Sequence, residues 1–208
     1  MYLYGAGGHA KVIIEIIKIM GETIDGLFDD NDHVEELTGI KVEKGIRITE
    51  GVFPILAAPV IISIGNNAER AEIAKRLANR FDVKFGKAVH STAIVSPSAS
   101  VAEGAMILHG AIIQAETKIG KHVLVNTAAS IDHENVIGDY AHISPHATLC
   151  GRVHIGEGTH VGAGAVVLPN IKIGKWCKIG AGTVVIRDIP DFSTAVGNPA
   201  RILVKVKA

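Results

Sequence analysis

Residues 131–155 read IDHENV IGDYAH ISPHAT LCGRVH I, and every sixth residue of this stretch is a large aliphatic one. The same spacing extends in both directions from Val95 to Val185, where all sixteen positions hold Val, Ile or Leu. Chance does not produce such a run in a chain with 48% hydrophobic residues. Since neither helices nor strands have a period of six, the pattern predicts a solenoid whose coils stack on one continuous core.

A second track of smaller residues follows the first, four positions after each aliphatic residue. Its members are Ala99, Ala105, Ala111, Thr117, Val123, Ala129, Asn135, Ala141, Ala147, Val153, Thr159 and Ala165. We expect both tracks to point into the core. Asn135 is then the anomaly, because an inward polar amide must find hydrogen-bond partners. The second position of many repeats is Gly, as expected at a corner where a Cβ atom would be costly.

The first half of the chain follows a different pattern. Apolar strands are expected at residues 2–4, 23–28, 60–64 and 83–85, with amphipathic helices at 10–20 and 68–80. Strands that alternate with helices predict a parallel sheet. We therefore expect a small Rossmann-like α/β domain over residues 1–88, followed by an all-β solenoid domain with a C-terminal extension over residues 89–208.

The composition narrows the class of partner. Lys and Arg together number 21, as do Asp and Glu, so no basic excess favours nucleic acid or a membrane surface. The two cysteines form no metal motif, which favours a reducing compartment. No signal peptide is recognised, and no apolar run reaches the roughly 18 residues of a membrane span. The sequence thus predicts a cytoplasmic protein.

The solenoid half resembles the hexapeptide-repeat acyltransferases, which are left-handed parallel β-helices with three hexads per coil. Five further stretches resemble, in order, bacterial nucleotide-sugar acetyltransferases of the NeuD/PglD type: YLYGAGGHAKV (2–12), LFDD (27–30), SIGNN (63–67), NTAASIDHENVIGDYAHISPHA (126–147) and VGNPARIL (196–203). The resemblance implies transfer of acetyl from acetyl-CoA, without a metal, to the 4-amino group of a nucleotide-linked deoxy sugar. It also implies a homotrimer with active sites between neighbouring β-helices.

The catalytic pair implied by the resemblance is His133 and Glu134, as general base and supporting carboxylate. A histidine suits proton removal from an amine near neutral pH, and a nearby carboxylate favours its imidazolium. Neighbours on an extended strand point to opposite sides, so Glu134 reaches His133 only if the chain bends there. The chain has ten histidines, and the residues alone leave a structural role for His133 open.

For acetyl-CoA, the resemblance implies contacts from His142 and from a set of small residues that let an extended arm approach the backbone. The set is Gly151, Ala163, Gly180, Ala181 and Gly182. A role as plain turn residues is the alternative for each. His142 and His160, one expected coil apart, should stack at one corner edge, and for His160 we favour a solvated corner histidine. Asn126 is expected to orient the sugar or the thioester carbonyl, with a turn role as the alternative.

The resemblance implies that three segments, each of which follows an expected strand, hold the nucleotide sugar. They are Gly7, Gly8 and His9; Asp29 and Asp30; and Gly65, Asn66 and Asn67. Carboxyl ends of parallel strands share one sheet edge, and a glycine turn at a helix N-terminus binds anions. The motif Gly5-x-Gly7-x-x-Ala10 also matches a loose dinucleotide fingerprint, but the domain is too short for the full NAD-binding fold.

Three alternatives remain at this stage. The first is a sialic acid O-acetyltransferase, which belongs to the same branch. The second is a zinc lyase of the γ-type carbonic anhydrase class, which needs an H-x4-H pair that this sequence lacks. The third is a non-catalytic scaffold, which the polar break at 131–135 disfavours. For the preferred reaction we expect direct transfer, because no Ser or Cys nucleophile adjoins His133 in the sequence.

Overall fold

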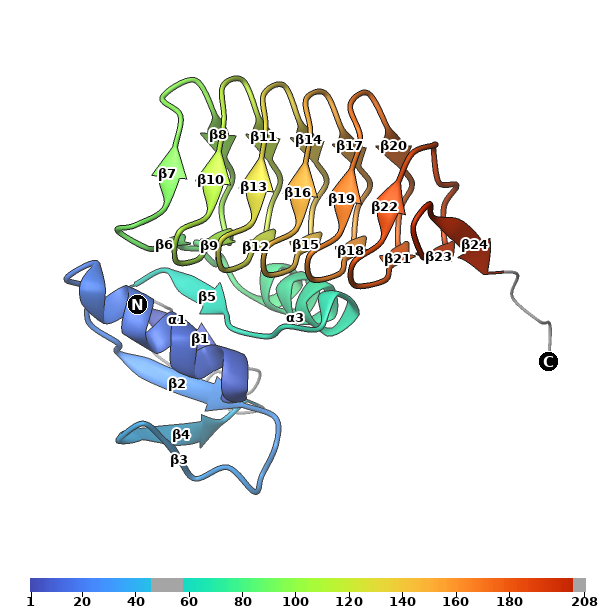
Figure 1. Ribbon diagram of the computed structural model, residues 1–208. Coiled ribbons are helices and arrows are strands. Elements are labelled where there is room, and N and C mark those ends of the chain that lie inside the picture. The colour runs from blue at the N-terminus through green and yellow to red at the C-terminus, as the bar shows by residue number, and fades with distance from the viewer. Residues whose placement is uncertain (46–57, 204–208) are drawn as a thin grey trace, which may run out of the picture.

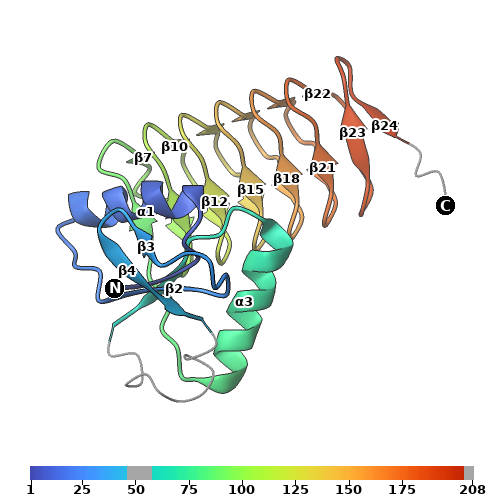
Figure 2. The same cartoon turned by 90° about the horizontal axis from the view of Figure 1, so that it is seen from below.

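The computed structural model describes residues 1–45 and 58–203, and it has two parts (Figure 1). Residues up to about 85 form an α/β layer structure, and the rest forms a parallel β-coil of triangular cross-section. The α/β part lies against one face of the coil, as both ribbon views show (Figure 2). The left-handed β-helix preceded by a small parallel sheet is therefore confirmed.

The N-terminal sheet has the strand order β3-β4-β2-β1-β5. Its strands are β1 (Tyr2–Tyr4), β2 (Gly26–Asp29), β3 (Glu36–Leu37), β4 (Ile40–Lys44) and β5 (Val60–Ile62). All pair in parallel except β3, which forms a hairpin with β4. Sequence reasoning missed this hairpin because its strands are short and half exposed. The strand expected at 83–85 is reduced to one bridge, between Phe85 and Val60.

Two helices cover the two faces of this sheet. Helix α1 (Gly8–Ile19) packs on the side of Leu3 and Ile61, and its buried isoleucines also reach Met106 and Leu124 of the coil. Helix α3 (Asn67–Arg80) packs on the opposite side, in a cluster with Phe28 and Ile62. Helix α1 is thus a shared layer between the sheet and the coil.

The coil consists of short strands stacked as three sheets, here called faces I, II and III. Face I holds β6 (Ala88–Val89), β9 (Met106–Ile107), β12 (Leu124–Val125), β15 (His142–Ile143), β18 (His160–Val161), β21 (Lys178–Ile179), β23 (Thr194–Val196) and the antiparallel β24 (Arg201–Leu203). Face II holds β7 (Ile94–Val95), β10 (Ile112–Ile113), β13 (Ser130–Ile131), β16 (Thr148–Leu149), β19 (Val166–Val167) and β22 (Val184–Val185). Face III holds β8 (Ser100–Val101), β11 (Lys118–Ile119), β14 (Val136–Ile137), β17 (His154–Ile155) and β20 (Lys172–Ile173).

Both inward tracks read from the sequence line the coil core. The aliphatic track and the small track meet in one cluster, with Val95, Val101 and Ala99 partly buried at its open end. The polar members Thr117, Asn135 and Thr159 are fully buried. Strand partners are eighteen residues apart, as in the pairing of His142 with His160, so three hexads make one coil.

The corners between faces explain two features of the repeat. From Gly104 to Gly182 every corner places its fourth hexad position in the left-handed region, as for Glu134 with φ 58°. Glycine at the second position serves a different need, because the adjacent coil passes very close. A Cβ atom on Gly156 would lie 2.5 Å from the backbone carbon of Gly174. The glycines therefore permit tight coil stacking rather than a special dihedral angle.

Two side chains of helix α3 join the α/β part to the coil. The buried Arg70 guanidinium donates to the carbonyls of His122 (2.9 Å) and Tyr140 (2.8 Å), and also to Ile64 (2.9 Å). The Asn67 amide donates to the Gly158 carbonyl (3.0 Å). Burial lowers the pKa of Arg70 to about 10, so the group stays charged at neutral pH. These bonds fix the sheet edge near Ile64 relative to face I.

Candidate functional site

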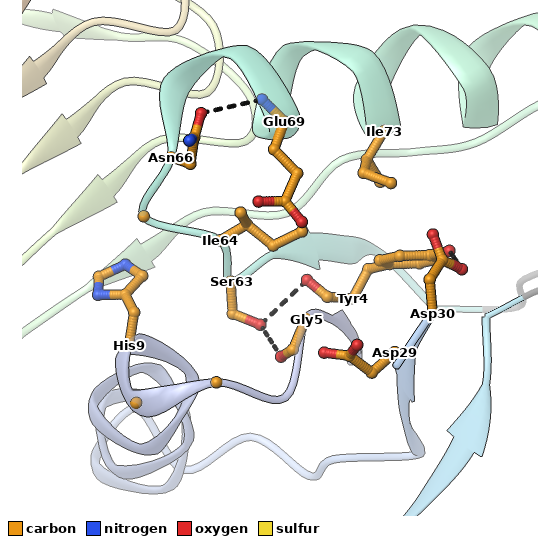
Figure 3. A pocket seen from close by; sticks show the side chains of 13 residues that line it. Tyr4, Gly5, His9, Asp29, Asp30, Ser63, Ile64, Asn66, Glu69 and Ile73 are labelled. Carbon is orange, nitrogen blue, oxygen red and sulfur yellow. Dashed lines mark hydrogen bonds between the residues drawn. The ribbon is translucent and has the colours of Figure 1, made fainter. Parts of the chain in front are cut away.

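A pocket of about 250 Å³ opens at the carboxyl ends of β1, β2 and β5 (Figure 3). Its lining residues are Tyr4, Gly5, Gly7, Gly8, His9, Asp29, Asp30, Ser63, Ile64, Gly65, Asn66, Glu69 and Ile73. We call it the N-terminal pocket. It brings together the three segments singled out in the sequence, apart from Asn67. The side chain of Asn67 has other partners: its nitrogen donates to the Gly158 carbonyl, and its oxygen accepts from Arg70.

The two aspartates of this pocket are already partnered. Asp29 accepts from the backbone amides of Ala6 and Asn31, so it holds the glycine turn in place. Asp30 bonds the hydroxyl of Tyr4 and pairs with Arg76 at 2.7 Å. Burial, with the adjoining Asp30, raises the pKa of Tyr4, which therefore remains a neutral phenol. Both carboxylates shape the pocket in addition to any contact with a ligand.

The two helices that border the pocket differ at their N-termini. In α3 the side chain of the N-cap residue Asn66 accepts from the amides of Ala68 and Glu69. In α1 the N-cap residue is Gly7, which has no side chain to cap the helix. An added Cβ at Gly7 or Gly8 would meet nothing within 4 Å. The start of α1 thus has backbone amides without a side-chain cap, an arrangement that favours a nearby anion.

His133 and Glu134 lie at the corner between faces II and III. The His133 Nδ1 atom is 2.9 Å from the Glu134 carboxylate, and Arg152 Nε donates to the same oxygen at 3.0 Å. The left-handed backbone of Glu134 supplies the bend that this contact requires. The hydrogen bond with His133, followed by the charge of Arg152, lowers the pKa of Glu134, which stays ionised. Within residues 1–45 and 58–203 no group bonds His133 Nε2, which can therefore act as a base.

The surroundings of His133 hold its ring and its backbone. The buried Asn135 amide donates to the carbonyls of Asp132 (2.7 Å) and Cys150 (2.9 Å), which ties the turn to the next coil. This is the function of the polar break in the inward track. Gly151 lies one coil further along, and a Cβ there would be 2.6 Å from the His133 ring. Gly151 thus leaves room for the imidazole.

His142 lies on β15 of face I rather than at a corner, contrary to expectation, because it occupies the last hexad position. Its ring stacks on His160 with centroids 4.6 Å apart, as expected for a pair one coil apart. His142 Nε2 is 3.1 Å from the Asn126 amide nitrogen, and His160 Nε2 is 2.7 Å from the Ser144 hydroxyl. His160 is therefore a bonded strand residue, not a plain solvated corner histidine. Burial, then the neighbouring His160, lowers the pKa of His142 to about 3.

The small residues assigned to acetyl-CoA fall on two corners. Ala163, Gly180, Ala181 and Gly182 share the corner between faces I and II, where the Gly182 amide donates to the Ala163 carbonyl at 2.8 Å. Gly151 lies at the corner between faces II and III, beside His133. Asn126 belongs with His142 and not with His133. Face II thus separates two groups of predicted site residues.

In a single chain, the His133 corner and the N-terminal pocket lie on opposite sides of the coil. The turns that join β13 to β14 form the edge remote from face I, whereas the α/β part lies against face I (Figure 1). Among the residues that the structure describes, no side chain bridges this distance. One copy of the chain therefore does not assemble all the predicted site residues.

Several pocket residues were not predicted from the sequence. Ser63 donates to the carbonyls of Tyr4 and Gly5, and Glu69 and Ile73 line the wall formed by α3 (Figure 3). Their positions depend on how α3 packs on the sheet, which no local pattern reveals. Arg152 was detectable, because it follows Glu134 by eighteen residues and such residues stack on adjacent coils.

Two further observations concern ligand and membrane chemistry. Across the two described ranges, no three His, Cys, Asp or Glu side chains are grouped so that they could hold a metal ion. In the same ranges, neither helix has the length and apolarity required to cross a bilayer.

Comparisons with known proteins agree with this architecture. The PglD N-terminal domain family matches residues 1–77, and the bacterial transferase hexapeptide family matches residues 136–168 and 152–187. Two curated relatives match about half of the chain. They are UDP-N-acetylbacillosamine N-acetyltransferase of Bacillus subtilis (43% identity over 112 residues, 51% of this chain) and an uncharacterized mimivirus protein (31% over 104 residues, 50% of this chain). The matched regions span 50% and 20% of those two proteins.

Solved structures match nearly the whole chain. A variant of perosamine N-acetyltransferase from Caulobacter crescentus, in complex with CoA and GDP-perosamine, is 32% identical with a TM-score of 0.91, covering 98% of this chain and 96% of that one. The acetyltransferase domain of PglB from Neisseria gonorrhoeae is 33% identical with a TM-score of 0.90, covering 97% and 98%. With its α/β pocket, its hexapeptide coil and its His-Glu corner, the chain belongs to the hexapeptide-repeat nucleotide-sugar acetyltransferases of the NeuD/PglD type.

Proposed function

We propose that the chain transfers an acetyl group from acetyl-CoA to the amino group of a nucleotide-linked sugar, with a 4-amino-deoxy sugar as the expected acceptor. The observation that carries the proposal is the His133–Glu134 pair, whose Nδ1–carboxylate bond leaves Nε2 as the free basic atom. The relatives with CoA and GDP-perosamine support the same chemistry. We place the proposed reaction of acetyl-CoA with the nucleotide-linked sugar in the cytoplasm.

In this proposal His133 takes the proton of the sugar amine as the nitrogen attacks the thioester carbonyl. The carboxylate of Glu134 stabilises the imidazolium that forms, and Arg152 keeps that carboxylate ionised and oriented. The new C–N bond forms as the C–S bond breaks, and CoA leaves as the thiol after proton return. Asn126 and backbone amides are candidates for the oxyanion contact. No acetyl-enzyme is required.

The two substrates are assigned to different surfaces. The nucleotide sugar would occupy the N-terminal pocket, with its diphosphate at Gly7 and Gly8 and with Gly65 and Asn66 on the opposite wall. The pantetheine arm would run along the corner of Ala163 and Gly180–Gly182. This corner suits an extended arm, because an added Cβ at Gly182 would meet nothing within 4 Å. His142 would face the thioester end of the arm.

A homotrimer would complete the site. The outward residues of face II carry no charge, and nothing in the described parts of the chain lies over them (Figure 1): Ile94, Ile112, Ser130, Thr148, Val166 and Val184. The corresponding positions of face III include Lys118, His154 and Lys172. Association through face II would bring the His133 corner of one copy to the N-terminal pocket of its neighbour.

The test is release of CoA thiol from acetyl-CoA by the purified full chain. The acceptors are UDP-, GDP-, dTDP- and CMP-linked amino sugars, with free sialic acid as the competing substrate. We expect turnover with a nucleotide-linked 4-amino sugar and loss of it when the sugar amine is already acetylated. Turnover with sialic acid alone would establish the O-acetyltransferase reaction instead. Absence of thiol release with every acceptor would refute the proposal.

A further inference from the structure

A second cavity, of about 500 Å³, adjoins the N-terminal pocket on face I. We call it the Trp176 cavity, and its lining residues are Gly65, Asn66, Asn67, Ala68, His142, Gly158, His160, Trp176, Cys177 and Lys178. Gly65 and Asn66 line both cavities, so the two are continuous across the start of α3. Its size falls within the range that small ligands occupy in proteins. Of these residues, the assignments made above for the nucleotide sugar and acetyl-CoA use Gly65, Asn66 and His142, and they give no role to Trp176 or Lys178.

Trp176 is the single tryptophan of the chain, and its ring is half-buried in a fixed position. A Cβ on Gly158, one coil earlier, would lie 2.3 Å from the indole ring, so the ring packs directly on the glycine backbone. Its backbone amide donates to the Glu157 carbonyl at 2.7 Å. The coil therefore holds the indole at the wall of the cavity. An aromatic wall of this kind offers apolar contact area together with polar edges.

The other side chains of the cavity are mostly neutral and able to form hydrogen bonds. Burial lowers the pKa of both His142 and His160, which keeps their imidazoles neutral near pH 7. Of the described residues that line the cavity, Lys178 alone carries a formal charge at that pH. The amides at the start of α3 are capped by Asn66, in contrast to the open start of α1. The cavity thus suits a neutral polyhydroxyl group better than a diphosphate.

The order of the two cavities gives the ligand a direction. Figure 3 shows Asp29 and Asp30 on one side of the N-terminal pocket and Asn66 on the other, with His9 of the first turn of α1 on the Asn66 side. The nucleoside would extend toward the aspartates. The group attached to the far phosphate would then cross Gly65 and Asn66 and enter the Trp176 cavity, beside His142.

We propose that the Trp176 cavity binds the hexose of the nucleotide sugar, with the apolar C–H face of the pyranose ring against the indole of Trp176. His160 and Lys178 bond hydroxyl groups at the ring edge, and the sugar amine is directed toward His142 and the catalytic base. A deoxy sugar gains from this arrangement, because its methyl group enlarges the apolar face. This assignment rests on the proposed acetyl-transfer function and specifies its acceptor subsite.

The sole tryptophan gives a direct test on the intact wild-type protein. Its fluorescence is followed while the nucleotide sugar found active in the thiol assay is added, and again with the matching nucleoside diphosphate. We expect a saturable change in emission with the nucleotide sugar. The diphosphate alone, shown by calorimetry to bind, should leave the emission unchanged. A change of equal size with both ligands, or with neither, would overturn the hexose assignment.

Substitution separates sugar contact from folding. Trp176→Ala should raise the KM for the nucleotide sugar about 10-fold, with the Kd of the nucleoside diphosphate and the KM for acetyl-CoA unchanged, and Trp176→Phe should restore most of the loss. Phe192→Ala is the matched control, because Phe192 is an exposed coil aromatic with positive φ outside the cavity. If Trp176→Ala weakens sugar and diphosphate binding equally, the residue is structural. If the Trp176 variants transfer acetyl as well as the wild type, the hexose assignment is refuted and the proposed function stands. If the wild type transfers no acetyl, the proposed function itself is refuted.

Discussion

His133 and His142 are nine residues apart, half a coil, and the fold gives them opposite properties. His133 lies at an exposed corner with about half of its side chain accessible, and it bonds a carboxylate. His142 lies under the α/β part, stacked on another histidine, and burial lowers its pKa to about 3. The first imidazole is open to solvent and bonded to a carboxylate, whereas burial keeps the second neutral. One coil thus provides a proton acceptor and a neutral hydrogen-bonding group on different faces.

The sharpest way to break this comparison is to remove the proposed base. His133→Ala should lower kcat at least ~100-fold, because the attacking amine loses its proton acceptor. The KM for either substrate should change little. His154→Ala is the matched control, since His154 is also an exposed coil histidine and its side chain forms no hydrogen bond or ion pair among the described residues. Near-normal kcat in the His133 variant would show that the base lies elsewhere.

Acid should lower the stability of the protein through its buried histidines. His9 and His122 have pKa values lowered to about 4 by burial, from 6.5. A depressed pKa means that the folded state favours the neutral form, so the stabilising contribution is complete above pH 6.5 and is lost as pH falls toward 4. Each such histidine should cost about 2 kcal/mol of unfolding free energy between pH 7 and pH 5.

Urea denaturation at the two pH values measures this loss. His122→Phe should reduce it, because phenylalanine can keep the ring contacts with Phe85 and Tyr140 without a titrating group. His154→Phe should leave the loss as in the wild type. A pH dependence that His122→Phe does not change would mean that other groups titrate.

If one active site takes its base from one copy of the chain and its N-terminal pocket from another, the two parts can be disabled on different chains. Gly8→Glu places a negative charge in the open first turn of α1, where the side chain has space and where acids favour helix formation. The charge should repel the diphosphate and raise the KM for the nucleotide sugar at least about 10-fold. Thermal stability should not decrease, and Gly8→Gln controls for side-chain size.

Mixing the two impaired variants, assayed at a nucleotide-sugar concentration well below the KM of the Gly8→Glu variant, then tests the shared site. Chains with Gly8→Glu and chains with His133→Ala are unfolded together and refolded. Hybrids should contain some sites with an intact pocket from one chain and an intact base from another, so part of the activity returns. Activity no higher than that of the separate variants would contradict a site formed between copies.

A smaller effect is expected from the partner of the base. Glu134→Gln should keep the hydrogen bond to His133 and lose the negative charge. We expect kcat to fall roughly fivefold, because the imidazolium loses the charge that stabilises it while solvent already screens an exposed pair. An unchanged kcat would separate Glu134 from the reaction.

The sequence was most informative where the structure is periodic. The hexads specified the coil, the inward tracks and the stacking of His142 on His160, because each follows from repetition alone. The β3–β4 hairpin was missed because its two short strands carry no comparable pattern. Single site residues could be predicted, but their contacts could not, because those contacts follow no repeat. Asp30 could be placed at a sheet edge, but its bond to Tyr4 and its pairing with Arg76 depend on how α3 packs.

The bonds from α3 to the coil carry one more consequence. They reach the carbonyls of His122, Tyr140 and Gly158, which lie on three successive coils at the same corner. The position of the α/β part along the axis of the coil is therefore fixed by one hydrogen-bonded carbonyl on each of three coils. A whole coil could be added or removed after Gly182 without moving the pocket relative to His142. The same change between His122 and Gly158 would break the alignment and, with it, the meeting of sugar and thioester.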